Sequence, residues 1–167
     1  MMNLQVLIDA PFGAVSISGA NNQLTIELIP CALSDEQQQA SINDDALPAQ
    51  VRQACQQIKQ YFAQPTALLN IAVPPHGTSF QQRVWQAIAA IPIGETRTYS
   101  QLAEQIGSGS RAVANACGAN PLPILIPCHR VVAKHGLGGF MQGKQDGLLI
   151  KQWLLKHEGV NLDGVSK

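Results

Sequence analysis

The adjacent residues Cys128 and His129 are the pair in this sequence best suited to nucleophilic chemistry. A free thiol has a pKa of about 8.5, so it needs a base such as an imidazole to become a thiolate at neutral pH. Glu158, at the end of the last predicted helix, could orient that imidazole as the third member of a proton relay. Pro127 fixes one backbone angle directly before the thiol. A cysteine in an apolar run is more often a packed core residue, so this pattern alone leaves both interpretations open.

The segment before this pair, Ile-Leu-Ile at residues 124–126, is apolar and lies between two prolines. Such a run is typical of a short strand, here one that leads to Cys128. Adjacent residues of a strand point to opposite faces, so we expect the contact between Cys128 and His129 to run through a turn or a water.

The other three cysteines, Cys31, Cys55 and Cys117, match no pattern of a disulfide framework or a zinc site. No two cysteines have CxxC spacing, and no cluster with histidine has zinc-finger spacing. We therefore expect no bound metal and no cofactor, and we interpret Cys117 as a packing residue.

The elements predicted for the first part of the chain are mostly strands. Residues 4–8, 13–18 and 24–29 are rich in β-forming side chains and are separated by turn residues, which predicts two hairpins of a small antiparallel sheet. Apolar residues at helical spacing predict a helix over 48–62, with Val51, Cys55, Ile58 and Phe62 on its buried face, and an apolar run predicts a strand over 67–73.

The second part of the chain is predicted to be mostly helical. Capping-box patterns predict helices that begin near Thr78 and near Thr98. Ser110 could cap a third helix over 111–118, and an amphipathic helix is predicted over 147–157 through Ile150, Trp153, Leu154 and His157. The short helices around the glycine-containing turn 107–109 suggest a helix-turn-helix, although an ordinary helix corner has the same pattern.

Charge and composition change together near residues 74–77, where we place a boundary between lobes 1–75 and 76–167. The chain of 167 residues is 46% hydrophobic and 13% charged, which is enough for a sizeable core. Its formal net charge is zero, but the first lobe holds two basic and six acidic residues and the second holds nine and five. A basic half suggests a polyanionic partner, and chance segregation of charge explains the same numbers.

The N-terminus has no basic segment followed by a long apolar one, so we expect no secretory signal. No apolar run approaches the roughly 20 residues that span a bilayer. These features predict a cytoplasmic protein without a membrane partner.

Six segments of the second lobe resemble the O6-alkylguanine-DNA alkyltransferases, also called methylated-DNA–protein-cysteine methyltransferases. The PCHRV signature with its upstream Asn-Pro is highly specific for this family. The resemblance implies an α+β fold, with a ribonuclease-H-like N-terminal lobe and a winged-helix-like C-terminal lobe that holds a helix-turn-helix and the active-site cysteine. The matching segments are FQQRVW (80–85), IPIGETRTYSQLA (91–103), RAV (111–113), NPLPILIPCHRVV (120–132), GGF (138–140) and KQWLLKHEG (151–159).

The resemblance also implies a role for individual residues in a single, irreversible transfer of a methyl or alkyl group. Cys128 would be the acceptor, and His129 and Glu158 would supply its thiolate through a water. Tyr99 would donate a proton toward the departing guanine, and Asn120 would brace the turn before the active-site segment. The residues implied to contact DNA are Arg111, Tyr99, Ser100, Gln81 and Ala112, and those implied to line the substrate pocket are Pro123, Val131, Phe140 and Met141.

The implied partner is double-stranded DNA that carries O6-alkylguanine, and O4-alkylthymine is a further expected substrate. The third helix would enter the minor groove, and Arg111 would fill the stack when the damaged nucleotide rotates out. We expect the protein to act as a monomer.

Two other functions remain open from the sequence. Relatives that bind the lesion without chemistry lack the acceptor cysteine, whereas Cys128 is present here. Relatives that act in transcription carry an additional cysteine-rich metal domain, and we expect none here, because the sequence contains no cysteine-rich segment of that kind. The chain departs from the family pattern in a shorter turn before Arg111, in Phe140 where tyrosine is usual, and in a longer loop over 141–147, and these departures bear on its substrate range.

Overall fold

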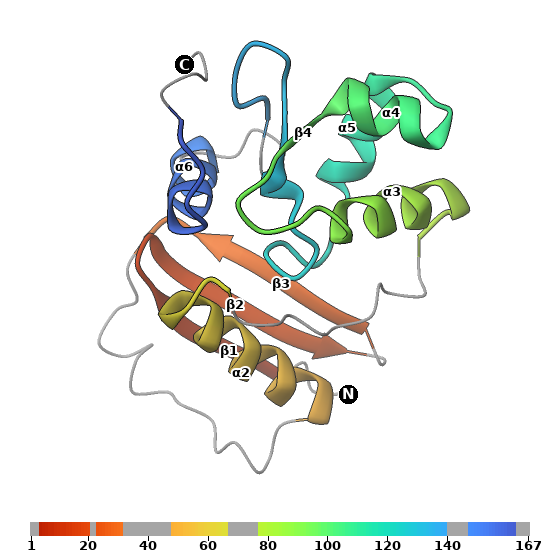
Figure 1. The fold of residues 1–167 in the computed structure, drawn as a ribbon. Coiled ribbons are helices and arrows are strands. Elements are labelled where there is room, and N and C mark those ends of the chain that lie inside the picture. The colour runs from red at the N-terminus through yellow and green to blue at the C-terminus, as the bar shows by residue number, and fades with distance from the viewer. Residues whose placement is uncertain (1–3, 21–22, 32–47, 67–76, 140–146, 163–167) are drawn as a thin grey trace. The chain divides into compact units, whose positions relative to one another are not determined.

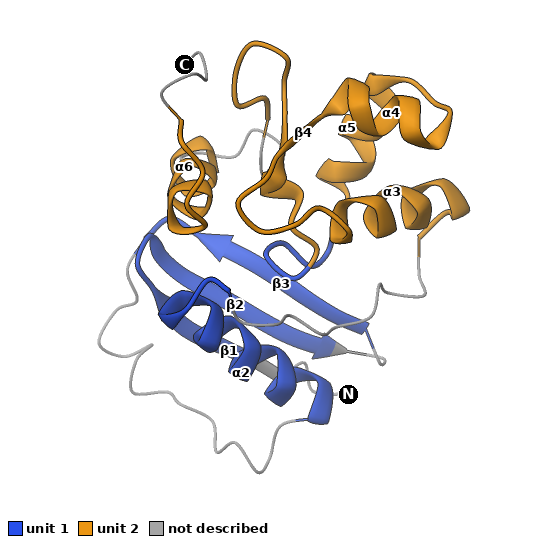
Figure 2. Ribbon diagram, in the orientation of Figure 1, with its two compact units in different colours: residues 1–72, 121–125 blue, residues 73–120, 126–167 orange. Residues whose placement is uncertain are grey.

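The described structure is mixed α+β, with a small antiparallel sheet and five helices of eight or more residues among the described residues. A computed structural model of the chain (Figure 1) describes residues 4–20, 23–31, 48–66, 77–139 and 147–162. The chain divides into two compact units (Figure 2), residues 1–72 with 121–125 and residues 73–120 with 126–167. The lobe boundary predicted near residues 75–76 and the strand predicted over 67–73 lie outside the described residues.

Unit 1 contains the predicted three-stranded sheet. Strands β1 (Leu4–Ala10), β2 (Gly13–Ala20) and β3 (Gln23–Ile29) are antiparallel in the order β1-β2-β3, which confirms the two hairpins. Four consecutive residues of the central strand, Ala14 to Ile17, are buried, so both faces of β2 are covered. In β3 exposed and buried residues alternate, as expected for a strand with one covered face.

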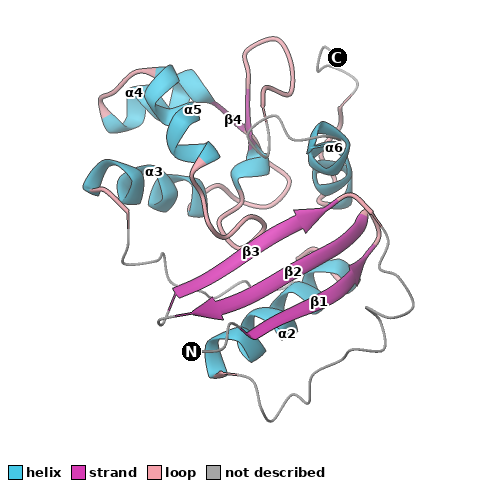
Figure 3. Ribbon diagram, turned by 180° about the vertical axis from the view of Figure 1, so that it is seen from behind, coloured by secondary structure: helices cyan, strands magenta, loops and turns pink. Residues whose placement is uncertain are grey.

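Helix α2 (Ala49–Ala63) lies along one face of this sheet (Figures 1 and 3). Its predicted position is confirmed, and Val51, Cys55 and Ile58 are buried as expected. The predicted stripe differs at its end, because Tyr61 is fully buried and Phe62 only half-buried. Phe62 instead packs its ring edge-to-face against Phe12, with centroids 5.8 Å apart.

Residues 121–125 belong to unit 1 although they are far from the sheet in sequence. The Ile26 N–H donates to the Pro121 carbonyl at 2.9 Å. The strand predicted over 124–126 is wrong, because these residues form a turn in which Ile124 has a φ of 75°. Prolines on both sides cannot donate hydrogen bonds to a neighbouring strand, and the left-handed backbone of Ile124 ends any extended run.

Unit 2 begins with helices whose starts follow the predicted caps. Helix α3 (Ser79–Ala89) starts at a capping box of Thr78 and Gln81. Helix α4 (Tyr99–Ile106) starts at a second capping box of Thr98 and Gln101. Both predictions are confirmed, since each hydroxyl accepts from the third backbone N–H and each glutamine side chain accepts from the cap N–H.

The turn between α4 and α5 (Ser110–Gly118) sets the two short helices against each other. Gly107 ends α4 in a left-handed conformation with a φ of 73°, which glycine adopts at low cost. The predicted cap at Ser110 is wrong, because the chain is already helical there and the cap residue is Gly109, with no side-chain hydrogen bond. A buried bond of 2.9 Å from the Trp85 ring nitrogen to the Ala116 carbonyl joins α3 to α5.

The remainder of unit 2 assembles segments that are distant in sequence. Strand β4 (Arg97–Thr98) pairs in parallel with β5 (Val131–Val132), which comes after a short 3-10 helix, η2 (Cys128–Arg130). Helix α6 (Gly147–His157) has the predicted bounds. Its buried residues include Ile150, Lys151, Leu154 and Leu155, whereas Trp153 and His157 are only half-buried and stack on each other at 4.6 Å. No helix within the described ranges is long and apolar enough to cross a membrane.

Candidate active site

Cys128 begins the 3-10 helix η2, directly after a tight turn at Pro127. Pro127 has a φ of −79° and a ψ of 65°, and the Cys128 N–H donates to the Ile126 carbonyl at 2.7 Å. These values define an inverse γ-turn. The Asn120 side-chain amide donates to the same carbonyl at 2.8 Å, so two donors hold the turn in place. The sequence had suggested that Cys128 lies at the end of a strand. It lies instead in a helical turn.

The Cys128 thiol is buried, with 8% of its residue surface exposed. Burial raises the pKa of Cys128, while a hydrogen bond from the Asn120 side chain and the charge of Lys151 lower it. Cys117 and Tyr99 lie close enough to Cys128 to interact with it electrostatically, and burial raises the pKa of each to about 12. Cys128 therefore lies near two other protonated acidic groups, those of Cys117 and Tyr99, and near the Lys151 ammonium group.

His129 and Glu158 form the predicted contact, and both side chains are fully buried. The His129 Nε2 and Glu158 Oε2 atoms are 2.7 Å apart. Burial lowers the pKa of His129 and the Glu158 carboxylate opposes this effect, so the imidazole is neutral at neutral pH. The other ring nitrogen, Nδ1, is buried and has no hydrogen-bond partner among the described residues, which makes it the atom able to accept a proton.

Arg130 binds the same carboxylate, a contact that was not predicted from the sequence. Its Nε donates to Glu158 Oε1 at 2.8 Å and its Nη2 donates to Oε2 at 3.1 Å. The remaining Nη1 donates to the Ile91 carbonyl at 2.6 Å. Both oxygens of a fully buried Glu158 are thus engaged in a bidentate ion pair.

Lys151 is the second site residue that sequence reasoning missed. Its ammonium group is fully buried and donates to three carbonyls, those of Val131 at 2.7 Å, Leu137 at 2.5 Å and Gly139 at 2.9 Å. Burial lowers the pKa of Lys151 to about 8, against the opposing effect of the two nearby cysteines. The only available signal was a lysine on the buried face of a predicted amphipathic helix.

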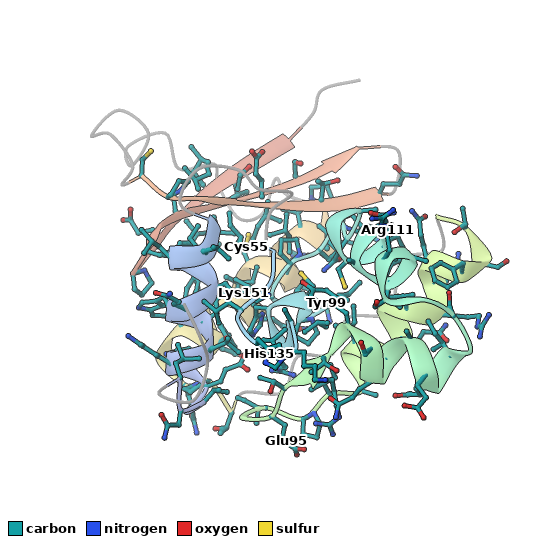
Figure 4. All side chains as sticks on the ribbon, turned by 90° about the horizontal axis from the view of Figure 1, so that it is seen from above. Cys55, Glu95, Tyr99, Arg111, His135 and Lys151 are labelled. Atoms are coloured by element: carbon teal, nitrogen blue, oxygen red, sulfur yellow. The ribbon has the colours of Figure 1, made fainter. Side chains whose placement is uncertain are left out.

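Tyr99 lies at the first turn of α4 and faces the same region as Lys151 (Figure 4). The Lys151 Nζ atom is 5.9 Å from the centre of the Tyr99 ring. The Tyr99 hydroxyl donates to the Gly139 carbonyl at 3.3 Å. Gly138 has a φ of 75°, and a Cβ atom there would lie 2.7 Å from the Tyr99 ring, so glycine is required beside Tyr99.

The residues implied to contact DNA are spread over the helical part of unit 2. Arg111 and Ser100 are exposed, and Arg111 lies away from Tyr99 and Lys151 (Figure 4). Ala112 is half-buried next to Arg111 in α5. The Gln81 side-chain oxygen accepts from the Thr78 N–H, so part of this side chain is committed to capping α3.

The structure describes two of the four implied pocket residues, Pro123 and Val131. Val131 is buried, and its carbonyl is one of the Lys151 acceptors. Pro123 is half-buried and belongs to unit 1, whereas Val131 belongs to unit 2. Phe140 and Met141 lie outside the described residues. In the parts of the chain that the structure describes, no three His, Cys, Asp or Glu side chains form a group able to hold a metal ion.

Known proteins resemble this chain across both units. Residues 79–160 match the family model described as 6-O-methylguanine DNA methyltransferase, DNA binding domain. The methylated-DNA–protein-cysteine methyltransferase of Methanosarcina acetivorans is 46% identical over 110 residues, which cover 65% of this chain and 69% of that protein. The protein of the same name from Mycobacterium bovis is 37% identical over 153 residues, 90% of this chain and 89% of the relative. The chain belongs to the methylated-DNA–protein-cysteine methyltransferase family.

The fold agrees with this family as well. The crystal structure of Mycobacterium tuberculosis OGT in complex with DNA superposes with a TM-score of 0.67 at 32% identity, covering 93% of this chain and 92% of that chain. The matched family region contains Tyr99, Asn120, Cys128, His129 and Glu158. All five predicted catalytic residues therefore lie inside one matched region of the chain.

Proposed function

We propose that this chain repairs DNA by moving an alkyl group from the O6 atom of guanine to the sulfur of Cys128. The observation that carries the proposal is the arrangement at η2, where a buried thiol is followed by a neutral imidazole bound to Glu158. This arrangement lies inside the region that matches the 6-O-methylguanine DNA methyltransferase model. The protein is a methyltransferase of DNA repair that consumes its own acceptor residue.

The first step is removal of the Cys128 proton. The proton moves, directly or through a water, to the His129 Nδ1 atom, which has no other hydrogen-bond partner among the described residues. Glu158 accepts a hydrogen bond from Nε2 and stabilises the imidazolium that results. The nearby Lys151 ammonium favours the thiolate, because its charge lowers the pKa of Cys128.

The second step is displacement at the alkyl carbon. A sulfur electron pair forms the new C–S bond while the C–O6 bond breaks, and the electron pair of that bond leaves with the guanine. Tyr99 donates a proton to the departing base and later regains one from the solvent. Its pKa of about 12 means that the hydroxyl is protonated and available as a donor at neutral pH. The product is a thioether, and no group in the site cleaves a C–S bond, so each chain acts once.

The implied DNA surface is the helix-turn-helix of α4 and α5. Helix α5 has small side chains and carries exposed Arg111 in its first turn, which suits entry into the narrow minor groove. The O6 atom of guanine is inside the duplex, so the damaged nucleotide must rotate out, and Arg111 would take its place in the stack. We propose a monomer with this binding mode, a ribonuclease-H-like first lobe and a winged-helix-like second lobe, and O4-alkylthymine as a further substrate.

The test is the intact mass of the protein after incubation with a duplex oligonucleotide that contains one O6-methylguanine. We expect the mass to rise by one methylene equivalent per chain and then stop, with the added methyl group on the peptide that contains Cys128. An undamaged duplex of the same sequence is the control and should leave the mass unchanged. Selective binding of the damaged duplex without any gain in mass would instead identify a lesion-binding protein without chemistry.

Gly138 provides a prediction about the position of Tyr99. In the Gly138→Ala variant, the added Cβ atom would lie 2.7 Å from the Tyr99 Cε2 atom and 3.0 Å from its hydroxyl, so the ring must move. A displacement of about 1 Å can reduce a rate about 100-fold, and we expect a loss of this order in the single-turnover transfer rate. The left-handed backbone also strains alanine by about 1–2 kcal/mol, which urea unfolding measures.

The neighbouring Gly139→Ala variant is the matched control. Among the described residues, apart from the two chain neighbours, no atom lies within 4 Å of a Cβ placed at Gly139, and the backbone there is not left-handed. We expect its transfer rate and stability to match the original protein. Equal transfer rates for the two variants would show that the position of Tyr99 does not limit the reaction.

A further inference from the structure

Arg130 is the charged residue nearest to the relay that the proposed reaction does not use. It comes directly after His129 in η2, and its guanidinium donates two hydrogen bonds to Glu158 and one to the Ile91 carbonyl. It is 7% exposed, so little of the guanidinium is available to solvent or DNA. Its role must therefore be sought in the carboxylate that it shares with His129.

The sharing of Glu158 determines which nitrogen of His129 carries a hydrogen. Oε2 contacts both Arg130 and the His129 Nε2 atom, and Oε1 contacts Arg130. A carboxylate paired with a guanidinium is ionised and only accepts hydrogen bonds, so Nε2 must be the donor. The neutral imidazole then has its free electron pair on Nδ1, the nitrogen that has no partner among the described residues. A protonated Glu158 would permit the opposite tautomer, which cannot accept a proton at Nδ1.

Arg130 also balances the charge beside the imidazole. The charged groups that act on His129 are Glu158, which favours the imidazolium, and Arg130 and Lys151, which disfavour it. Removal of Arg130 would take away a positive charge that disfavours the imidazolium. The imidazole would then be protonated at a higher pH and would be unable to take the proton of Cys128.

We propose that Arg130 is a positioning residue of alkyl transfer, which through Glu158 keeps His129 neutral with its hydrogen on Nε2 and its acceptor atom Nδ1 open. This inference rests on the proposed function, because it assigns a cause to the proton transfer from Cys128. Arg130 contributes a positive charge and a planar guanidinium that binds both oxygens of Glu158. A separate variant tests each contribution.

The experiment compares single-turnover transfer rates as a function of pH for Arg130→Gln and Arg130→Lys. Loss of the positive charge in Arg130→Gln should move the acid limb of the profile to higher pH by about half a unit or more. Arg130→Lys retains the charge and loses the bidentate geometry, so its rate should fall while the acid limb stays in place. Arg97→Gln, which removes a partly exposed arginine paired with Glu95, is the matched control and should leave the profile unchanged. A folded Arg130→Gln protein with the original pH profile would overturn the proposal.

A second measurement does not depend on the folding of variants with a broken buried ion pair. Nitrogen-15 NMR of the original protein, labelled in its histidines, reports the hydrogen on each ring nitrogen of His129. We expect the Nε2–H tautomer from pH 8 down to below the ordinary pKa of histidine. An imidazolium at neutral pH, or a hydrogen on Nδ1, would overturn the proposal even if transfer to Cys128 occurs. A protein that shows the expected tautomer and transfers no methyl group would refute the proposed function and leave the tautomer assignment standing.

Discussion

Replacement of Cys128 by alanine is expected to abolish methyl transfer, whereas the same replacement at Cys117 should preserve it. The two thiols make a stringent pair, because both are largely buried and both interact electrostatically with Lys151. They differ in their neighbours along the chain. Cys128 begins the η2 turn that continues into His129, whereas Cys117 lies near the end of α5. Only Cys128 therefore has a base directly next to it in the same turn.

The measurement is intact-protein mass after incubation with excess duplex that carries one O6-methylguanine. Cys128→Ala should gain nothing at any incubation time, and Cys117→Ala should gain one methylene equivalent at a rate close to that of the original chain. Circular dichroism of both variants establishes that they are folded. Methylation of Cys117 in a folded Cys128→Ala protein, or loss of transfer in a folded Cys117→Ala protein, would contradict the assignment of the acceptor.

Replacement of Lys151 by methionine should lower both the stability and the transfer rate. Methionine fills a similar volume but leaves the Val131 and Leu137 carbonyls without the Lys151 donor, and Gly139 keeps only Tyr99. A buried polar group left unpaired costs about 1–3 kcal/mol. The pKa of about 8 shows that burial of the ammonium is itself unfavourable, which offsets part of this loss. We expect a net decrease in the free energy of unfolding of about 2 kcal/mol.

The expected effect of Lys151→Met on the reaction has an electrostatic cause. The Lys151 charge lowers the pKa of Cys128, so its removal makes the thiolate less accessible at neutral pH. A nearby opposite charge typically changes such an equilibrium by about tenfold or more, and the single-turnover rate at pH 7 should fall accordingly. Urea unfolding and the transfer rate are to be compared with Lys156→Met, an exposed lysine of the same helix, which should change neither. Equal stability and rate for the two variants would exclude Lys151 from the site.

Local patterns in the sequence were sufficient for the elements that position the site. The capping boxes at Thr78 and Thr98 were predicted correctly because every atom of such a box lies within three residues of the cap. The sheet of β1, β2 and β3 was predicted from turn residues and β-forming runs, which are also local. The strand predicted before Cys128 was wrong, because a short apolar run between prolines has no periodicity that distinguishes a strand from a buried turn.

For the site itself, the sequence determined which residue types are available, and the family resemblance, through the PCHRV and KQWLLKHEG segments, identified Cys128, His129 and Glu158 as a group. The bond between His129 and Glu158 is present as expected. Arg130 and Lys151 were missed for a common physical reason: their partners are Glu158 and four backbone carbonyls that lie 12 to 39 residues away. No spacing rule relates a buried charge to carbonyls at such separations. Only the tertiary structure brings these groups together, because packing of α6 against η2 and the segment after it removes water from both charges, and protein atoms must then replace that water.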